Sequence, residues 1–296
     1  MQKSSDILIF DRNRVAQARA RALPEFEQYN FLFEWSKNNL IDRISDINRT
    51  FTNALQIGAR GAVKQHDKIT SLTTLDLLEK TSVNSPYICA SEEFLPIASQ
   101  SIDLLFSNLC LHSVNDLPGA LLQIRRALKA DGLFIASMLG GETLHEMRKV
   151  MAEAELEIYG GISPRISPFA DKPQMGDLLQ RAGFALPVVD SDIITVTYDN
   201  VFKLMKDLRG MGENNAIIAR KKTPTSKAFF MSVAKKYHDK FAESDGRIVA
   251  SFEVIFLLGW SPHESQQKPL KPGSAEHKLA DILGTQEIKT GEKAKP

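Results

Sequence analysis

Two glycines and one aspartate mark the place where this sequence could bind a small molecule. Gly58 and Gly61 directly follow a short apolar run at 54–57, and Asp76 follows the next run at 71–75. After a buried strand, a glycine turn lets backbone amides approach a nucleotide, and an acid at the end of the second strand can accept both hydroxyls of a ribose. Plainer interpretations remain, since two glycines also make a tight turn and Asp76 could cap a helix.

Polar residues that could complete such a site follow the next two apolar runs. Ser91 and Glu92 come after the third run and could contact an adenine ring, although Ser91 could as easily cap a turn. Asn108 and His112 follow the fourth run and would lie near a reacting group, where a histidine can exchange a proton near neutral pH. His112 could equally be a packed histidine at a strand-to-helix corner. Asp116 is predicted to be the N-cap of the next helix.

Residue spacing and charge exclude several other kinds of chemistry. Glu142 and His145 form a single Glu-x-x-His step without a partner, so we predict no metal site. The sequence has no Gly-x-Ser-x-Gly elbow and no Walker loop, which removes support for a serine hydrolase or a P-loop enzyme. Lys and Arg number 37 against 36 Asp and Glu, a balance that argues against nucleic-acid binding.

The cysteines and the apolar segments predict a soluble cytoplasmic protein. Cys89 and Cys110 lie in apolar surroundings and are expected to be buried, reduced thiols. Residues 1–14 contain too short an apolar run, flanked by too many charges, to be a signal peptide. The apolar stretch at 248–260 carries Glu253 and is about half the length of a membrane span, so we expect a buried strand there.

The elements that must position these residues alternate between strands and helices, which predicts an α/β fold built on a parallel sheet. Strands are expected at 54–57, 71–75, 87–90, 102–107, 133–137, 187–198 and 248–259. Helices are expected at 142–158 and 175–182, and Asp131–Gly132 is predicted to be the short turn between a helix and the next strand. A helical block at 199–247 precedes the last strand and could be a lid hinged at Gly210 and Gly212 or a docking surface for a partner.

Three parts are predicted along the chain. Residues 1–50 form an N-terminal helical cap with a break at Pro24, residues 51–265 form the α/β domain, and residues 266–296 form a flexible tail. The arginines of the cap are interpreted mainly as a solvated face, with contact to an acidic ligand or partner as the alternative. They are Arg12, Arg14, Arg19 and Arg21.

The order of these features resembles class I S-adenosylmethionine-dependent methyltransferases of the type 11 group. Four segments look more specifically like the mitochondrial complex I assembly factor 5 family and its bacterial homologues. These segments are PheAspArgAsnArg at 10–14, GlyGlyIleSerProArgIleSerProPheAla at 160–170, AspLeuArgGlyMetGlyGluAsnAsn at 207–215 and GlyTrpSerProHisGluSerGln at 259–266. The malonyl-carrier-protein methyltransferase of the biotin pathway is a more distant likeness.

The resemblance implies a Rossmann-like, seven-stranded sheet, binding of S-adenosylmethionine, and a protein substrate in respiratory complex I assembly. It leaves three activities open: methyl transfer, hydroxylation of an arginine in a complex I subunit, and a non-catalytic chaperone role. Bacterial cytoplasm, with peripheral association to a membrane complex, is the implied location. By position, the resemblance implies that the cofactor is held by Gly58, Asp76, Ser91, Glu92 and Asn108. His112 is the candidate catalytic base.

The glycine turn departs from the family pattern Asp-x-Gly-Cys-Gly-x-Gly. Gln56 stands in place of the acid, Ala59 in place of the cysteine, and Arg60 and Ala62 in place of the later glycines. Arg60 could fill the space of the cofactor's ribose or methionine carboxylate, or could pair with that carboxylate.

Overall fold

The computed structural model describes residues 8–63, 65–79, 85–267 and 279–286. The chain divides into two compact units, residues 1–262 and 263–296. The first unit contains the sheet and its covering helices. In the second, the described residues include one short helix, α8 (Leu279–Leu283), and most of the tail expected at 266–296 lies outside the described residues.

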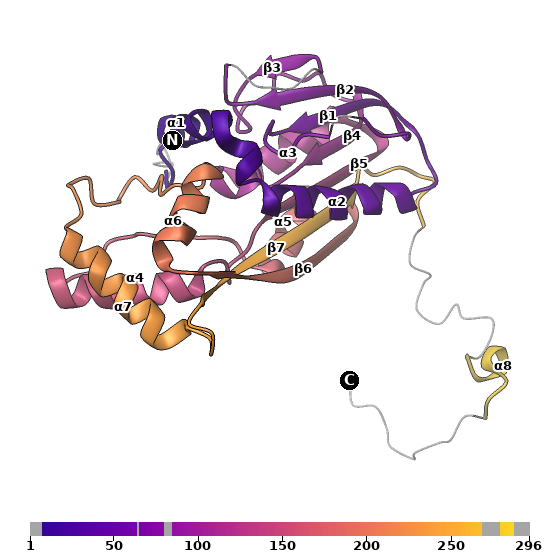
Figure 1. Cartoon of the computed structure of the whole chain (residues 1–296). Helices are drawn as coiled ribbons and strands as arrows, with labels where there is room; N and C mark the ends of the chain where they lie inside the picture. The colour runs from indigo at the N-terminus through magenta and orange to yellow at the C-terminus, as the bar shows by residue number, and fades with distance from the viewer. Residues whose placement is uncertain (1–7, 64, 80–84, 268–278, 287–296) are drawn as a thin grey trace, which may run out of the picture. The chain divides into compact units, whose positions relative to one another are not determined.

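A seven-stranded sheet forms the centre of the first unit, with strand order β3-β2-β1-β4-β5-β7-β6 (Figure 1). The first five strands pair in parallel, whereas β7 is antiparallel to both β5 and β6. The strands are β1 (Phe51–Ile57), β2 (Ile69–Asp76), β3 (Tyr87–Cys89), β4 (Ile102–Ser107), β5 (Leu128–Leu139), β6 (Ala185–Tyr198) and β7 (Ile248–Trp260). This sheet, with helices inserted before its last strand, confirms the predicted Rossmann-like α/β class.

Helices cover both faces of the sheet (Figure 1). One face packs on α2 (Phe31–Asp46), and the other packs on α3 (Leu117–Ala127) and α5 (Lys172–Arg181). The remaining elements are α1 (Arg12–Ala22), η1 (Leu23–Gln28), η2 (Leu111–Ser113), α4 (His145–Tyr159), α6 (Val201–Gly210) and α7 (Lys227–Phe241). Among the described residues, none of these helices has the length and apolar character needed to cross a bilayer.

The central strands are apolar on both faces because both faces are covered. Leu104 and Phe106 belong to the core shared with α2, while Leu105 between them belongs to the core shared with α3. Side chains alternate along a strand, so a strand buried on both sides reads as a continuous apolar run. β4 stays buried up to its carboxyl end, and the candidate site residues follow directly after it.

Capping residues define where the helices near the site begin. The Asp116 side chain accepts a hydrogen bond from Gly119 N at 2.9 Å, which confirms its predicted role as the N-cap of α3. Asp171 and Gln174 form a capping box at the start of α5. These caps end the loops after β4 and before α5, both of which border the site.

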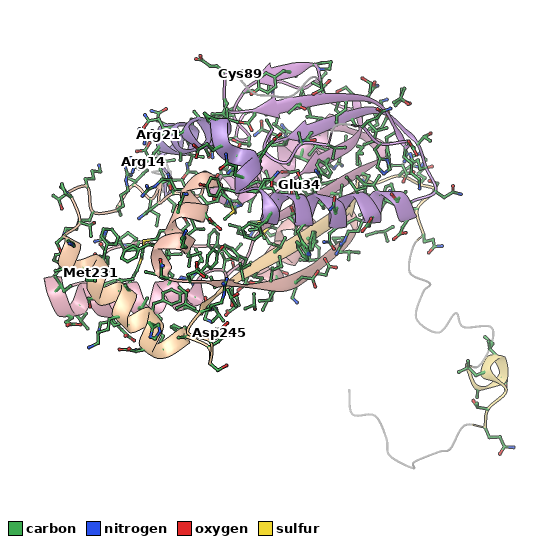
Figure 2. The ribbon with its side chains drawn as sticks, viewed as in Figure 1. Arg14, Arg21, Glu34, Cys89, Met231 and Asp245 are labelled. Atoms are coloured by element: carbon green, nitrogen blue, oxygen red, sulfur yellow. The ribbon has the colours of Figure 1, made fainter. Side chains whose placement is uncertain are left out.

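Two sequence expectations are corrected by the fold. Asp131–Gly132 does not link a helix to a strand: β5 already begins at Leu128, and Asp131 lies inside it with φ +58°. A shift in strand pairing between Ile102 and Leu104 accommodates this irregularity. Cys89 is exposed rather than buried, because it lies on the three-residue edge strand β3, whereas Cys110 is buried as expected (Figure 2).

Candidate functional site

The glycine turn after β1 is packed tightly against its surroundings. Gly58 and Gly61 have φ of +93° and +61°, a backbone region that favours glycine. A Cβ added at Gly61 would lie 2.8 Å from Asn108 Nδ2 and 2.9 Å from the Cβ of Phe33 in α2. The buried Gln56 side chain holds the turn from within, since its Nε2 donates to Gly58 O and its Oε1 accepts from Val63 N. The turn is thus fixed by protein contacts on every side.

Asp76 is fully buried at the end of β2 and bonds to backbone amides. Its Oδ2 accepts from Ala59 N at 2.6 Å, and its Oδ1 accepts from Leu78 N at 3.0 Å. Residues 77–79 form a bend, so the interpretation of Asp76 as a helix N-cap is wrong for the described residues. Asp76 instead ties the second strand to the glycine turn of the first.

Glu92 lies at the centre of a buried ionic cluster. Its side chain has no exposed surface, and Oε1 accepts from Arg19 Nη1 at 2.5 Å and from Cys110 Sγ at 3.0 Å. Arg12 Nη2 donates to the other carboxylate oxygen. Burial alone would raise the pKa of Glu92, but the charges of Arg19 and Arg12 outweigh it and lower the pKa to about 2. Glu92 is therefore ionised and paired twice.

The arginines of α1 differ from the sequence prediction, because some of them are buried and not exposed to solvent. Arg19 is 1% exposed and also lies 4.0 Å from Asp76 Oδ1, with Nη2 donating to Ser113 Oγ at 3.1 Å. The prediction of a solvated arginine face is wrong for Arg12 and Arg19, which both pair with Glu92. It holds for Arg21, which is exposed (Figure 2). Arg12 and Arg19 are two helical turns apart and so share one face of α1, which was the available signal.

Ser91 and Asn108 have supporting roles in this arrangement. Ser91 Oγ accepts from Glu93 N at 3.2 Å, the turn-capping interaction considered from the sequence. Asn108 is 1% exposed; its Nδ2 donates to Phe33 O and Gly61 O, and its Oδ1 accepts from Ser137 Oγ. Asn108 thus connects the ends of β4 and β5 to the glycine turn, whereas Ser91 is partly exposed.

His112 pairs with Glu213, a residue that the sequence analysis did not select. His112 Nε2 lies 3.0 Å from Glu213 Oε2, and Glu213 Oε1 accepts from Arg60 Nη1 at 2.8 Å. Burial alone would raise the pKa of Glu213, but its interactions with His112 and Arg60 outweigh burial and hold that pKa well below its usual range. His112 Nδ1 is buried and has no hydrogen-bond partner among the described residues. It is thus not a fully satisfied core histidine.

A cavity of about 460 Å³ lies beside this pair. Its lining includes Gly141, Arg148 and Ile217, together with the loop residues Pro164, Ile166, Ser167, Pro168 and Phe169. The ring of Phe169 packs edge-on against His112, with 5.9 Å between ring centroids. Arg165 holds the loop: Nε donates to Glu155 Oε1 and Nη1 to Thr225 Oγ1, each at 2.8 Å. Phe169 therefore connects the cavity to His112, which is not itself part of the lining.

S-adenosylmethionine does not fit the described arrangement. The carboxylates of Asp76 and Glu92 are fully buried and bonded to protein groups. The small cavity lined by Arg19, His112, Gly212 and Glu213 is about 20 Å³, roughly the room of one water molecule. Nucleotide-sized ligands occupy pockets of several hundred Å³. Arg60 is 3% exposed, its guanidinium lies over the Phe33 ring, and it donates to Met211 O and Glu213.

Metal ligands do not cluster in the part of the chain that the structure describes. No group of three or more His, Cys, Asp and Glu side chains there has the geometry to hold a metal ion.

Comparison with known proteins defines the family. A methyltransferase-domain model matches residues 64–136. The chain is 38% identical to the arginine-hydroxylase NDUFAF5 of Danio rerio over 93% of its own length and 89% of the relative's. It is 40% identical to the human protein of the same name, over 93% and 83%. The chain belongs to the arginine-hydroxylase NDUFAF5 family.

Other likenesses agree with a methyltransferase fold. The malonyl-[acyl-carrier protein] O-methyltransferase of Xylella fastidiosa is 40% identical over 57% of this chain and 55% of that protein. The YcgJ protein of Bacillus subtilis matches with TM-score 0.53 and 14% identity, over 77% of this chain and 98% of that one. A putative methyltransferase from Bacillus halodurans matches equally well, at 13% identity. This member of the NDUFAF5 family therefore has the class I methyltransferase fold, with α1 arginines against the acids after β2 and β3.

Proposed function

We propose that this chain modifies an arginine side chain of a protein substrate during respiratory complex I assembly, and that the modification is oxygen-dependent hydroxylation. One oxygen atom of O2 is inserted into a C–H bond of the arginine, and the other leaves as water with two electrons and two protons from an external reductant. The observation that carries the proposal is near full-length similarity to proteins named arginine-hydroxylase, at 38–40% identity over 93% of the chain. Methyl transfer is the less favoured chemistry, a preference supported by the buried pairing of Glu92 with Arg19 and of Arg60 with Glu213.

The cavity beside Phe169 is proposed to receive the substrate side chain. Its volume of about 460 Å³ suits a long side chain, and its proline-rich wall is held in place by Arg165. At the inner end of this wall, Glu213 accepts a hydrogen bond from His112 when the histidine proton is on Nε2, which leaves the Nδ1 lone pair free. We assign His112 the role of accepting a hydrogen bond or a proton from the substrate, and Glu213 the role of orienting it.

The test is a mass comparison of complex I subunits from wild-type cells and from cells lacking this gene. The expected result is a subunit arginine heavier by one oxygen atom in the wild type and unmodified in the deletion, restored by the wild-type gene and not by His112→Ala. An added methyl group would replace hydroxylation by methyl transfer. Identical subunits from both strains would overturn the enzymatic proposal.

A non-catalytic assembly role is the second candidate, and one observation favours it. The carboxylates of Asp76 and Glu92 form their hydrogen bonds with protein groups. This is expected of a site that is retained only for folding. If His112→Ala and Glu213→Gln restore complex I as well as the wild type does in the deletion strain, the chaperone role is supported. Failure of both folded variants to restore complex I would reject it.

A further inference from the structure

The carboxylates at the ends of β2 and β3 form their hydrogen bonds and ion pairs with other groups of the same chain. In a doubly wound sheet, an acid at the end of the second strand is positioned to bind a ribose, and here that acid is Asp76. Glu92 follows the next strand and faces the same cleft. Arg19 reaches both, at 2.5 Å from Glu92 Oε1 and 4.0 Å from Asp76 Oδ1. The guanidinium of Arg19 therefore stands where an adenosyl group would need to place its ribose and base.

An adenosyl ligand and Arg19 cannot share these carboxylates. Asp76 and Glu92 are both fully buried while α1 is docked. The neighbouring cavity lined by Arg19 and His112 has room for about one water molecule. Hydroxyl groups of a ribose are neutral donors, so they would replace the positive charge of the guanidinium that is now paired with Glu92. S-adenosylmethionine would also bring a sulfonium charge beside the cations of Arg19, Arg12 and Arg60.

The contacts of α1 show how this helix is attached to the rest of the structure. At its start, Ile9 N and Phe10 N donate to Asn115 Oδ1, and Asp11 N donates to Ala216 O. Along the helix, the buried apolar side chains are small: Val15, Ala18 and Ala22. A segment held by polar contacts and little apolar area belongs to the low-stability end of a structure, so α1 can separate without unfolding the sheet.

We propose that α1 is a tethered occupant of the adenosyl side of this site, so that Arg19 and an adenosyl ligand compete for Glu92 and Asp76. The ligand binds only when α1 is displaced. This competition does not depend on which substrate residue is modified. The competition can therefore be disproved while the proposed arginine hydroxylation stands, and hydroxylation can be disproved while the competition stands.

Calorimetric titration of the full chain with S-adenosylhomocysteine tests the competition. The variant Arg19→Met keeps the length of the side chain and removes its charge, and Glu92 retains Arg12 as a partner. We expect it to bind at least about tenfold more tightly than the wild type. Arg21→Met is the matched control, because Arg21 is on the same helix and exposed, and it should bind like the wild type. Equal affinity of Arg19→Met and the wild type, including no binding by either, overturns the proposal.

Hydrogen exchange of the wild-type chain provides a readout that does not depend on the variant's folding. With millimolar S-adenosylhomocysteine, the amides of α1 should exchange faster while those of the central strands stay unchanged. Unchanged or slower exchange in α1 would show that the ligand binds without displacing the helix, or not at all, and would overturn the proposal.

Discussion

Glu213 Oε2 lies 3.0 Å from His112 Nε2, and this contact joins the loop after α6 to the turn after β4. The same carboxylate accepts from Arg60, which covers the glycine turn. One acid thus holds together three segments that are distant in sequence. This loop belongs to the block at 199–247, for which the sequence leaves a lid and a docking surface open, and these contacts connect it to the turns after β1 and β4.

Replacing Glu213 by Gln should destabilise the fold as well as misorient His112. The amide keeps the shape but leaves the buried Arg60 without a counter-charge, which is expected to cost about 1–3 kcal/mol. Urea unfolding followed by circular dichroism measures it. Glu142→Gln, a change at an exposed acid, should stay within about 0.5 kcal/mol of the wild type. Equal midpoints for the two variants would contradict this role of Glu213.

Acid should destabilise the protein through Glu92 and Glu213. Their pKa values are lowered in the folded state, to about 2 for Glu92, whereas an unfolded Glu titrates near about 4.3. The stability they contribute is therefore complete above about pH 4.3 and is lost as the pH falls from there toward about 2. Unfolding free energies measured from about pH 6 down to about pH 3 should fall steeply. Glu92→Gln should show a flatter dependence, and a curve parallel to the wild type would refute the assignment.

Gly210 is expected to be a packing glycine and not a hinge. A Cβ at this position would lie 2.2 Å from the ring of Tyr29, so Gly210→Ala forces α6 away from η1 and should cost about 1–3 kcal/mol. Gly176→Ala is the matched control on α5, where nothing lies within 4 Å, and helix propensity should make it neutral or stabilising by up to about 1 kcal/mol. Thermal unfolding of both variants gives the comparison. A stable Gly210→Ala variant would restore the hinge hypothesis.

Arg165→Met should release the wall of the cavity. Glu155 is 2% exposed and would lose its cation, which is expected to cost about 3 kcal/mol and to free residues 160–170. Limited proteolysis should then cut within this loop faster than in the wild type, while Arg181→Met, on the exposed end of α5, should be cut at the wild-type rate. Cleavage at the wild-type rate in Arg165→Met would mean that other contacts hold the loop.

Local signals predicted the sheet well and the site only in part. β4 was placed at 102–107 from its apolar run alone, because a strand covered on both faces needs no polar residues. The N-cap role of Asp116 could also be predicted, since Pro118 and the donor Gly119 N lie within three residues of it. The burial of Arg19 could not be predicted, because a charge becomes buried only when a partner such as Glu92, 73 residues away, is folded against it. Glu213 was missed for the same reason, at 101 residues from His112.

The pairing of Phe10 with Ile217 has a consequence for how the protein matures in the cell. Phe10 is made well before Ile217, which follows six of the seven strands in the chain. A chain emerging from the ribosome can therefore pair Arg19 with Glu92 before it can form the bridge from Phe10 to Ile217. That bridge is a long-range step of this fold, and we expect it to follow formation of the parallel core. The anchoring of the start of α1 is thus expected to be among the last contacts of a newly made molecule to form.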